Sequence, residues 1–197
     1  MNLAANLREA LELGRHREVV LLEGDVMEPD SGPPTPAAVL VAVVDRPEPT
    51  VILTERPHTM RKHPGQISFP GGRIDPGDAD AVAAALREAE EEIGLDPKRV
   101  EVIGIGDRYR TITGFEVTTV VGVVPPGLDL RPHPGEVADM FEAPLRFLLD
   151  AERHAVRTAM FQGRERRYYE IVWEGRRIWG ATAAMIVNLS RRLELAT

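Results

Sequence analysis

The sequence predicts an α/β fold, and three of its segments carry this prediction. Residues 37–44 form an unbroken apolar run that is short enough to be a buried strand. Residues 79–93 consist mainly of Ala, Leu, Glu and Arg, which are strong helix formers. Residues 117–124 are rich in valine and predict a further strand. Strands and helices therefore alternate along the chain.

Length and composition indicate one compact domain. The 197 residues are 43% hydrophobic, which is enough to bury a substantial core without cross-links. The chain has no cysteine, so a disulfide framework and a zinc–thiolate site are excluded. A net charge of −7 argues against a protein that coats nucleic acid. With no long apolar run or signal segment, we expect a cytoplasmic monomer or homodimer without nucleic-acid or membrane partners.

The N-terminal residues predict a helix followed by a loop. Apolar side chains recur at helical spacing at Leu3, Leu7, Ala10 and Leu11. Gly14 is a stop for that helix, and the Pro- and Gly-rich residues 31–36 predict a loop. We expect residues 1–36 to be an extension packed on a single domain of residues 1–197. After the strand at 37–44, the proline-containing residues 46–49 predict a turn into a returning strand.

The remaining elements follow from similar patterns. Phe141, Pro144 and Leu145 are expected to begin a short helix that reaches about Asp150. Trp173 and Trp179 are expected to be core residues rather than a ligand platform. The other predicted elements are strands at 51–54 and 100–105, a hairpin of 155–161 with 168–173, a strand at 177–179 and a helix at 181–193.

The helix at 79–93 carries the main chemical signal. Asp78 is expected to be its N-cap, and Gly94 stands where a glycine ends a helix. Helical spacing brings Glu88, Glu91 and Glu92 onto one face, although like charges placed this way repel. A solvated acidic face is the ordinary explanation. The helix follows a Phe-Pro-Gly-Gly turn, however, and oxygen ligands clustered beside a core stripe suit Mg²⁺ or Mn²⁺.

Residues 87–95, Arg-Glu-Ala-Glu-Glu-Glu-Ile-Gly-Leu, resemble the core of the Nudix box at every position. Upstream the pattern differs, because the sixth residue after Gly72 is Asp78 rather than glutamate and Arg87 comes one residue late. The resemblance implies a Nudix-type α/β/α sandwich around a mixed β-sheet. It also implies a hydrolase that uses Mg²⁺ or Mn²⁺.

A second resemblance covers residues 52–72. Thr54, Arg56, Arg61, Gly65 and the Phe-Pro-Gly-Gly turn at 69–72 are similar to the signature of the coenzyme A pyrophosphatase branch of the family. Two positions differ, since an isoleucine replaces the first leucine and a proline replaces a small residue. Read alone, the basic segment 55–68 is a solvated surface loop. Its position before the glycine turn favours a role in binding an anionic substrate.

The resemblance and the spacing together assign roles around the metal. Glu88 and Glu92 are the first-choice ligands, and Glu91 is a further ligand or acts through water. The Gly72 region supplies a backbone carbonyl as a neutral ligand. Arg87 orients a neighbouring carboxylate. Glu136 is the candidate general base, from a loop remote from the helix, and Glu91 is its rival.

The function expected is hydrolysis of coenzyme A or its thioesters to 3′,5′-ADP and a 4′-phosphopantetheine product. Substrate contacts are expected from Arg56, Arg61, Lys62, Phe69 and Gly71. A Nudix hydrolase of ADP-ribose or another nucleoside diphosphate derivative is the alternative. A module that senses a nucleotide without catalysis is a third, and the intact glutamates argue against it. Four histidines have no spacing typical of a metal site and are expected at the surface: His16, His58, His133 and His154.

Overall fold

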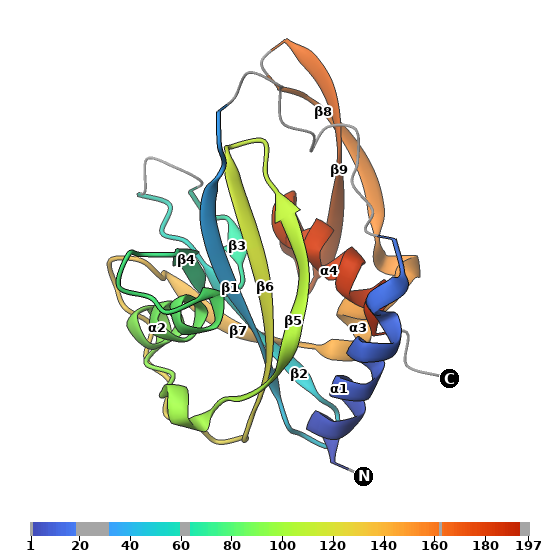
Figure 1. Cartoon of the computed structure of the whole chain (residues 1–197). Helices are drawn as coiled ribbons and strands as arrows, with labels where there is room; N and C mark the ends of the chain where they lie inside the picture. The colour runs from blue at the N-terminus through green and yellow to red at the C-terminus, as the bar shows by residue number, and fades with distance from the viewer. Residues whose placement is uncertain (1, 19–31, 60–63, 162, 194–197) are drawn as a thin grey trace.

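A mixed sheet of seven strands runs through the computed structural model, which describes residues 2–18, 32–59, 64–161 and 163–193 (Figure 1). The strand order is β3-β2-β1-β6-β5, with β4 also paired to β1 and β7 to β2. Strand bounds are β1 (Thr35–Val44), β2 (Thr50–Glu55), β3 (Ile67–Ser68), β4 (Gly71–Arg73), β5 (Glu101–Arg110), β6 (Phe115–Val124) and β7 (Asp139–Pro144).

Strand β1 is the centre of this sheet. It pairs in parallel with β6 along its whole length, from Thr35 opposite Phe115 to Val44 opposite Val124. Its side chains alternate between two cores, as the two-residue period of a strand requires. Val41 and Val43 enter one cluster of buried residues, whereas Leu40, Ala42 and Val44 enter the other. The apolar run predicted as a buried strand is therefore buried on both faces.

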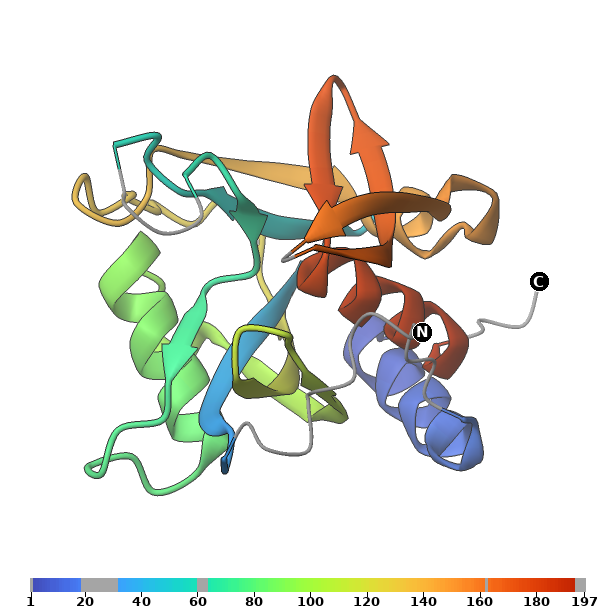
Figure 2. The same ribbon diagram turned by 90° about the horizontal axis from the view of Figure 1, so that it is seen from above.

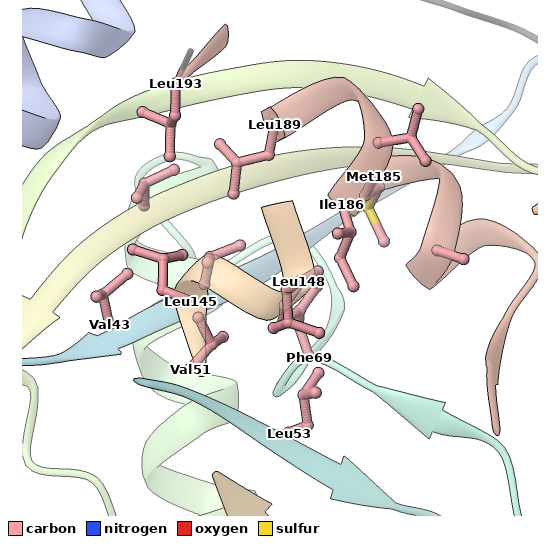
Figure 3. Packing of buried hydrophobic residues seen from close by; sticks show 14 of the residues in the cluster. Val43, Val51, Leu53, Phe69, Leu145, Leu148, Met185, Ile186, Leu189 and Leu193 are labelled. Carbon is pink, nitrogen blue, oxygen red and sulfur yellow. The ribbon is translucent and has the colours of Figure 1, made fainter. Parts of the chain in front are cut away.

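Helices cover the two faces of the sheet, so the α/β/α sandwich is confirmed. Figure 2 shows α2 on one side of the strands, with α1 and α4 on the other. The cluster beneath α1 and α4 also includes α3, and Figure 3 shows its Leu145 and Leu148 among the buried side chains. The helix bounds are α1 (Leu3–Leu13), α2 (Ala81–Ile93), α3 (Leu145–Leu149) and α4 (Ala181–Arg192).

A second, antiparallel sheet stands beside the first. Its strands are β8 (Ala155–Phe161), β9 (Arg164–Trp173) and β10 (Arg176–Trp179), in the order β10-β9-β8. The hydroxyl of Thr182, at the start of α4, donates to the Ile67 carbonyl of β3 over 3.0 Å. The predicted hairpin and third strand are present, and β10 contacts β3, the strand that leads to the glycine turn.

Helix α1 packs on the main sheet and on α4. Leu7 and Leu11 are buried. Arg192 at the end of α4 donates to Asp107 of β5 and to the Gly14 carbonyl that follows α1. None of the described helices combines the length and apolar character needed to cross a bilayer.

Several predicted boundaries were wrong, including those of β5, which continues to Arg110, and of β9, which begins at Arg164. Strand β1 begins at Thr35, inside the predicted loop. Helix α2 begins at Ala81, where Asp80 is the N-cap and accepts the Ala83 N–H over 2.8 Å, so Asp78 does not cap it. Phe141 belongs to strand β7, which pairs with β2, and only Leu145 onward is helical. The glycine stop at the end of α2 is confirmed, because Gly94 has φ 67°.

Two side-chain predictions also need correction. Trp179 is 36% exposed, because it lies on the outer face of β10, whereas Trp173 packs partly buried against the core. His154 is partly buried, and its Nε2 lies 2.8 Å from the Leu148 carbonyl oxygen. His16, His58 and His133 are exposed as predicted.

Candidate active site

The glycine turn brings strand β4 against helix α2. Gly71 has φ 153°, a conformation that side chains disfavour, and its N–H donates to the Glu92 carboxylate over 3.1 Å. A Cβ at Gly72 would lie 2.5 Å from the Glu88 carboxylate. Any side chain at this position would therefore push Glu88 away, so the two glycines allow a backbone and two carboxylates to meet.

The acidic face of α2 is not a uniformly solvated surface. Glu92 is only 6% exposed, and the side chains of Glu88 and Glu91 are 16% and 55% exposed. Burial raises the pKa of Glu92 to about 7, against the opposing hydrogen bond from Gly71; the nearby Glu88 and Glu136 raise it further. Burial likewise raises the pKa of Glu88, against the lowering effect of Arg87. The face therefore holds carboxylates that favour a nearby positive charge.

Arg87 connects this face to the turn before the helix. Its Nη1 lies 3.0 Å from Glu88 Oε1 and 2.9 Å from Glu91 Oε2. Its Nε and Nη2 donate to both Asp78 oxygens over 3.0 and 3.1 Å, and Nη2 also donates to the Arg73 carbonyl. The hydrogen bond to Asp78 is the main cause that raises the pKa of Arg87, so the guanidinium stays charged. Arg87 thus contacts the neighbouring carboxylates, and its orienting role stays a prediction.

Asp78 was missed as a member of the site. Its side chain is 7% exposed and its pKa is lowered, chiefly by the hydrogen bonds from Arg87. The carboxylate also accepts the Asp75 N–H over 2.8 Å, which closes the turn before α2. The sequence did contain a sign of this role, because Asp78 stands where the Nudix pattern has its first glutamate. Asp78 anchors Arg87 rather than capping the helix.

Glu136 lies on an exposed segment that is tied to the end of α2. The N–H groups of Arg131 and His133 donate to the carbonyls of Ile93 and Glu92 over 2.9 and 2.8 Å. This docking brings Glu136 close enough for its charge to raise the pKa values of both Glu88 and Glu92. The residue predicted as a remote base thus lies within electrostatic range of the predicted ligands.

Arg56 approaches the cluster from the opposite loop. Its backbone is fixed by hydrogen bonds with Gln66 and Gly65, and its charge lowers the pKa of Glu92. The structure thus brings Arg56 near the glutamates. Two predicted contacts of the same segment, Arg61 and Lys62, fall outside the described residues.

Phe69 has a different role from the predicted one. The side chain is 2% exposed and packs in the core cluster beneath α4, as Figure 3 shows near Leu53 and Leu148. A phenyl ring in that position anchors the turn by apolar burial and does not face a substrate. Gly71, the other predicted contact of this turn, lies at the site through its backbone.

The donor set fits a divalent cation. Among the described residues, no three acidic or histidine side chains are gathered closely enough to hold an ion as they stand. Arg87 engages Glu88 and Glu91, and the Gly71 N–H engages Glu92. The unfavourable crowding of Glu88 and Glu92 is nevertheless what a hard cation would relieve, and oxygen donors of this kind suit Mg²⁺ and Mn²⁺.

A separate hollow lies at the other end of the sheet. It has a volume of about 660 Å³ and is lined by the β1–β2 turn, the start of α1 and the start of β5, including Arg46, Lys98 and Glu101. Positive and negative side chains are mixed there. The acidic cluster, with its perturbed pKa values and convergent loops, is the better candidate for chemistry.

Comparisons with known proteins identify the family of this chain. Residues 34–161 match the family model described as NUDIX domain. Uncharacterized Nudix hydrolase NudL of Cronobacter sakazakii is 44% identical over 157 residues, which are 80% of this chain and 82% of the relative. The protein of the same name from Escherichia coli (strain K12) is 43% identical with the same coverage.

A solved structure supports the fold alone. The Nudix hydrolase RenU of M. smegmatis superposes with a TM-score of 0.50 at 23% identity, covering 62% of this chain and 80% of its own. The match of residues 34–161 to the domain model and the identity to the two relatives carry the assignment. The chain therefore belongs to the Nudix hydrolase family.

Proposed function

We propose that this Nudix hydrolase cleaves the diphosphate bond of coenzyme A or its thioesters. Water adds across the bond to give 3′,5′-ADP and 4′-phosphopantetheine or its acyl derivative. The observation that supports this substrate is the segment from β2 to the glycine turn, in which Thr54, Arg56, Gly65 and residues 69–72 fit the coenzyme A pyrophosphatase signature. The charge of Arg56 lowers the pKa of Glu92, which supports a single site made of the signature segment and the acidic cluster.

Glu88 and Glu92 would hold the Mg²⁺ or Mn²⁺, with Glu91 and the Gly72 carbonyl as further donors. When bound, the cation neutralises phosphate oxygens and acidifies a water. Arg87 keeps Glu88 and Glu91 oriented through its contacts with both. The protein's own groups thereby place negative oxygens where a diphosphate and a cation must meet.

Glu136 is the group proposed to accept the proton from the attacking water. It is exposed and therefore able to meet a substrate, and its charge acts on both Glu88 and Glu92. Glu91 is the rival, because it lies on the same helix and is 55% exposed. Its carboxylate is occupied by Arg87 at 2.9 Å, which favours Glu136.

The basic loop is proposed to select the substrate. Coenzyme A carries a 3′-phosphate that ADP-ribose lacks, and a guanidinium binds such a group through forked, charged hydrogen bonds. Arg56 and Arg61 are the proposed contacts, supported by Lys62. Positive charge gathered on a protein of net charge −7 would draw a polyanion to this loop.

Product analysis by mass spectrometry tests the proposal. Coenzyme A, dephospho-CoA, ADP-ribose and NADH are each incubated with the protein and either Mg²⁺ or Mn²⁺. We expect 3′,5′-ADP from coenzyme A as the preferred reaction and poorer turnover of dephospho-CoA. Equal turnover of dephospho-CoA and ADP-ribose would favour the general nucleoside diphosphate hydrolase instead. Binding without turnover of any of them would favour a sensing module.

The Arg56→Ala variant tests the proposed contact with the 3′-phosphate directly. We expect kcat/KM for coenzyme A to fall by the equivalent of roughly 1.5–3 kcal/mol, the worth of a charged hydrogen bond. Dephospho-CoA should be affected less if the lost contact is to the 3′-phosphate. Arg99→Ala is the matched control, since Arg99 is exposed at the other end of the sheet. An equal loss for both substrates would contradict the 3′-phosphate contact.

A further inference from the structure

The second sheet makes a contact with the two strand ends that lead to the site. Strand β2 ends at Glu55, directly before Arg56, and β7 begins at Asp139, three residues after Glu136. In Figure 2 the segments after β2 and before β7 both lie near α2. Arg176 of β10 reaches both strand ends. This arginine belongs to neither the Nudix core nor the basic loop.

The contact of Arg176 offsets the repulsion between two acidic side chains on neighbouring strands. Glu55 and Asp139 lie directly opposite each other in the antiparallel β2–β7 pair. Like charges in that position destabilise a strand pair. Arg176 Nη1 lies 3.2 Å from Glu55 Oε2, and Nη2 lies 2.7 Å from Asp139 Oδ2. One guanidinium therefore converts a repulsive pair into a bridged one.

The bridge has support on its remaining sides. The guanidinium carbon of Arg176 lies 4.3 Å from the centre of the Phe141 ring, a cation–π geometry. The Ala138 N–H donates to the Glu55 carbonyl over 2.8 Å, immediately beside the bridge. The Arg176 side chain is 32% exposed, so its ion pairs are partly shielded from water. The end of the strand pair is thus held by the ion pairs and the cation–π contact of Arg176 and, beside them, by the backbone hydrogen bond from Ala138 to Glu55.

The positions of Arg56 and Glu136 depend on that end of the strand pair. The segment that carries Glu136 is tied to the end of α2, because the His133 N–H donates to the Glu92 carbonyl over 2.8 Å. Arg56 is held by backbone hydrogen bonds with Gly65 and Gln66, which lead into the glycine turn. Arg56 and Glu136 extend from opposite strands, one residue beyond Glu55 and three before Asp139. If the strands separated there, the distance between the two charges across the cluster would grow.

We propose that Arg176 is a positioning residue that sets the separation of Arg56 and Glu136 across the active site. It touches neither substrate nor metal and acts through Glu55 and Asp139. The inference rests on the proposed diphosphate hydrolysis for its catalytic consequence. Its structural half, the closure of the β2–β7 end, is independent of the substrate.

Amide hydrogen exchange tests the structural half. Arg176→Gln removes the charge, and we expect the Ala138 amide to exchange roughly fivefold faster or more. Arg46→Gln is the matched control, because Arg46 forms a 2.8 Å ion pair with Glu142 on the same strand β7 but away from the site. That variant should leave Ala138 unchanged. Unchanged exchange at Ala138 in Arg176→Gln would overturn the proposal.

Steady-state kinetics test the catalytic half, on whichever diphosphate the wild type hydrolyses. We expect Arg176→Gln to raise KM and lower kcat, with a combined loss on the order of tenfold or more in kcat/KM. Adding Asp139→Asn to this variant removes the like-charge pair and should restore part of the loss. Arg176→Lys keeps a charge and should lie between, and it carries the test if Arg176→Gln does not fold.

Three results would overturn the catalytic half. These are an equal loss in Arg46→Gln, faster exchange at Ala138 with normal kinetics, or no recovery on adding Asp139→Asn. The first of them would mean that Arg176 contributes only general stability. A wild type that hydrolyses none of the diphosphates would refute the proposed function, while the exchange comparison would still decide whether Arg176 closes the strand pair.

Discussion

Removing the charge of Glu92 should make the metal-free protein more stable at neutral and alkaline pH. Burial raises the pKa of this group from 4.5 to about 7. A tenfold change in proton affinity corresponds to about 1.4 kcal/mol, so ionised Glu92 lowers the free energy of unfolding by about 3 kcal/mol. Glu92→Gln keeps the size of the side chain and an oxygen that can accept the Gly71 N–H, but it carries no charge.

The sign of the pH dependence follows from the direction of the shift. Between pH 4.5 and about 7 the folded protein keeps a proton on Glu92 that the unfolded chain has released. This group therefore makes the free energy of unfolding fall as the pH rises through that window. Below the window the wild type and Glu92→Gln should be similar. Above it the variant should be the more stable by about 3 kcal/mol.

Urea denaturation at several pH values, with metal removed by chelation, measures the difference. Glu90→Gln is the matched control, because Glu90 is exposed on the same helix and should not alter the slope. Added Mg²⁺ or Mn²⁺ should stabilise the wild type, since a ligand of the folded state raises the free energy of unfolding, and should stabilise Glu92→Gln much less. Parallel pH profiles for wild type and variant would refute the reasoning.

Two further predictions concern the groups around Glu92. Gly72→Ala should lower turnover on the order of 100-fold, because its Cβ would lie 2.5 Å from the Glu88 carboxylate and displace it; Gly77→Ala, which has open space around it, is the control. Glu136→Gln should lower kcat by about 10²–10⁴ if Glu136 is the base. An unchanged kcat in Glu136→Gln together with a large loss in Glu91→Gln would assign the base to Glu91.

Elements with strong local signals could be predicted from the sequence. Strand β1 and helix α2 have clear periodicity, and Gly94 marks the helix end through its left-handed conformation. Strand β7 could not be predicted in this way, because Phe141 is extended only through its pairing with β2 from a distant part of the sequence. A short segment with weak local preference takes the conformation that its tertiary partner imposes.

The start of α2 shows a second limit of local reasoning. Three aspartates, Asp75, Asp78 and Asp80, precede the helix, and each is a suitable cap by residue type. Only the fold distinguishes them, because Arg87 reaches back to Asp78 and leaves Asp80 to accept the Ala83 N–H. Sequence spacing identifies the capping region but not which carboxylate has which partner.

The candidate site was predictable in its residues but not in their environments. Helical spacing placed Glu88, Glu91 and Glu92 on one face. In the structure Glu92 is buried, whereas Glu91 is largely exposed. The difference arises because β4 and the segment around His133 pack against one side of the helix end. Contacts between segments so far apart in the sequence leave no local pattern.

The crowding of carboxylates is itself an argument for function. A helix face that only covered the sheet would be more stable with neutral side chains at Glu88 and Glu92, since burial opposes the charge of both. Arg87 compensates part of this cost but is shared with Asp78, and Arg56 approaches from a loop rather than from the core. The fold therefore maintains a local excess of negative charge at the turn where Gly71 and Gly72 bring the backbone against the carboxylates. An unfavourable arrangement held in place by specific contacts is typical of a site that is completed by a bound cation and its substrate.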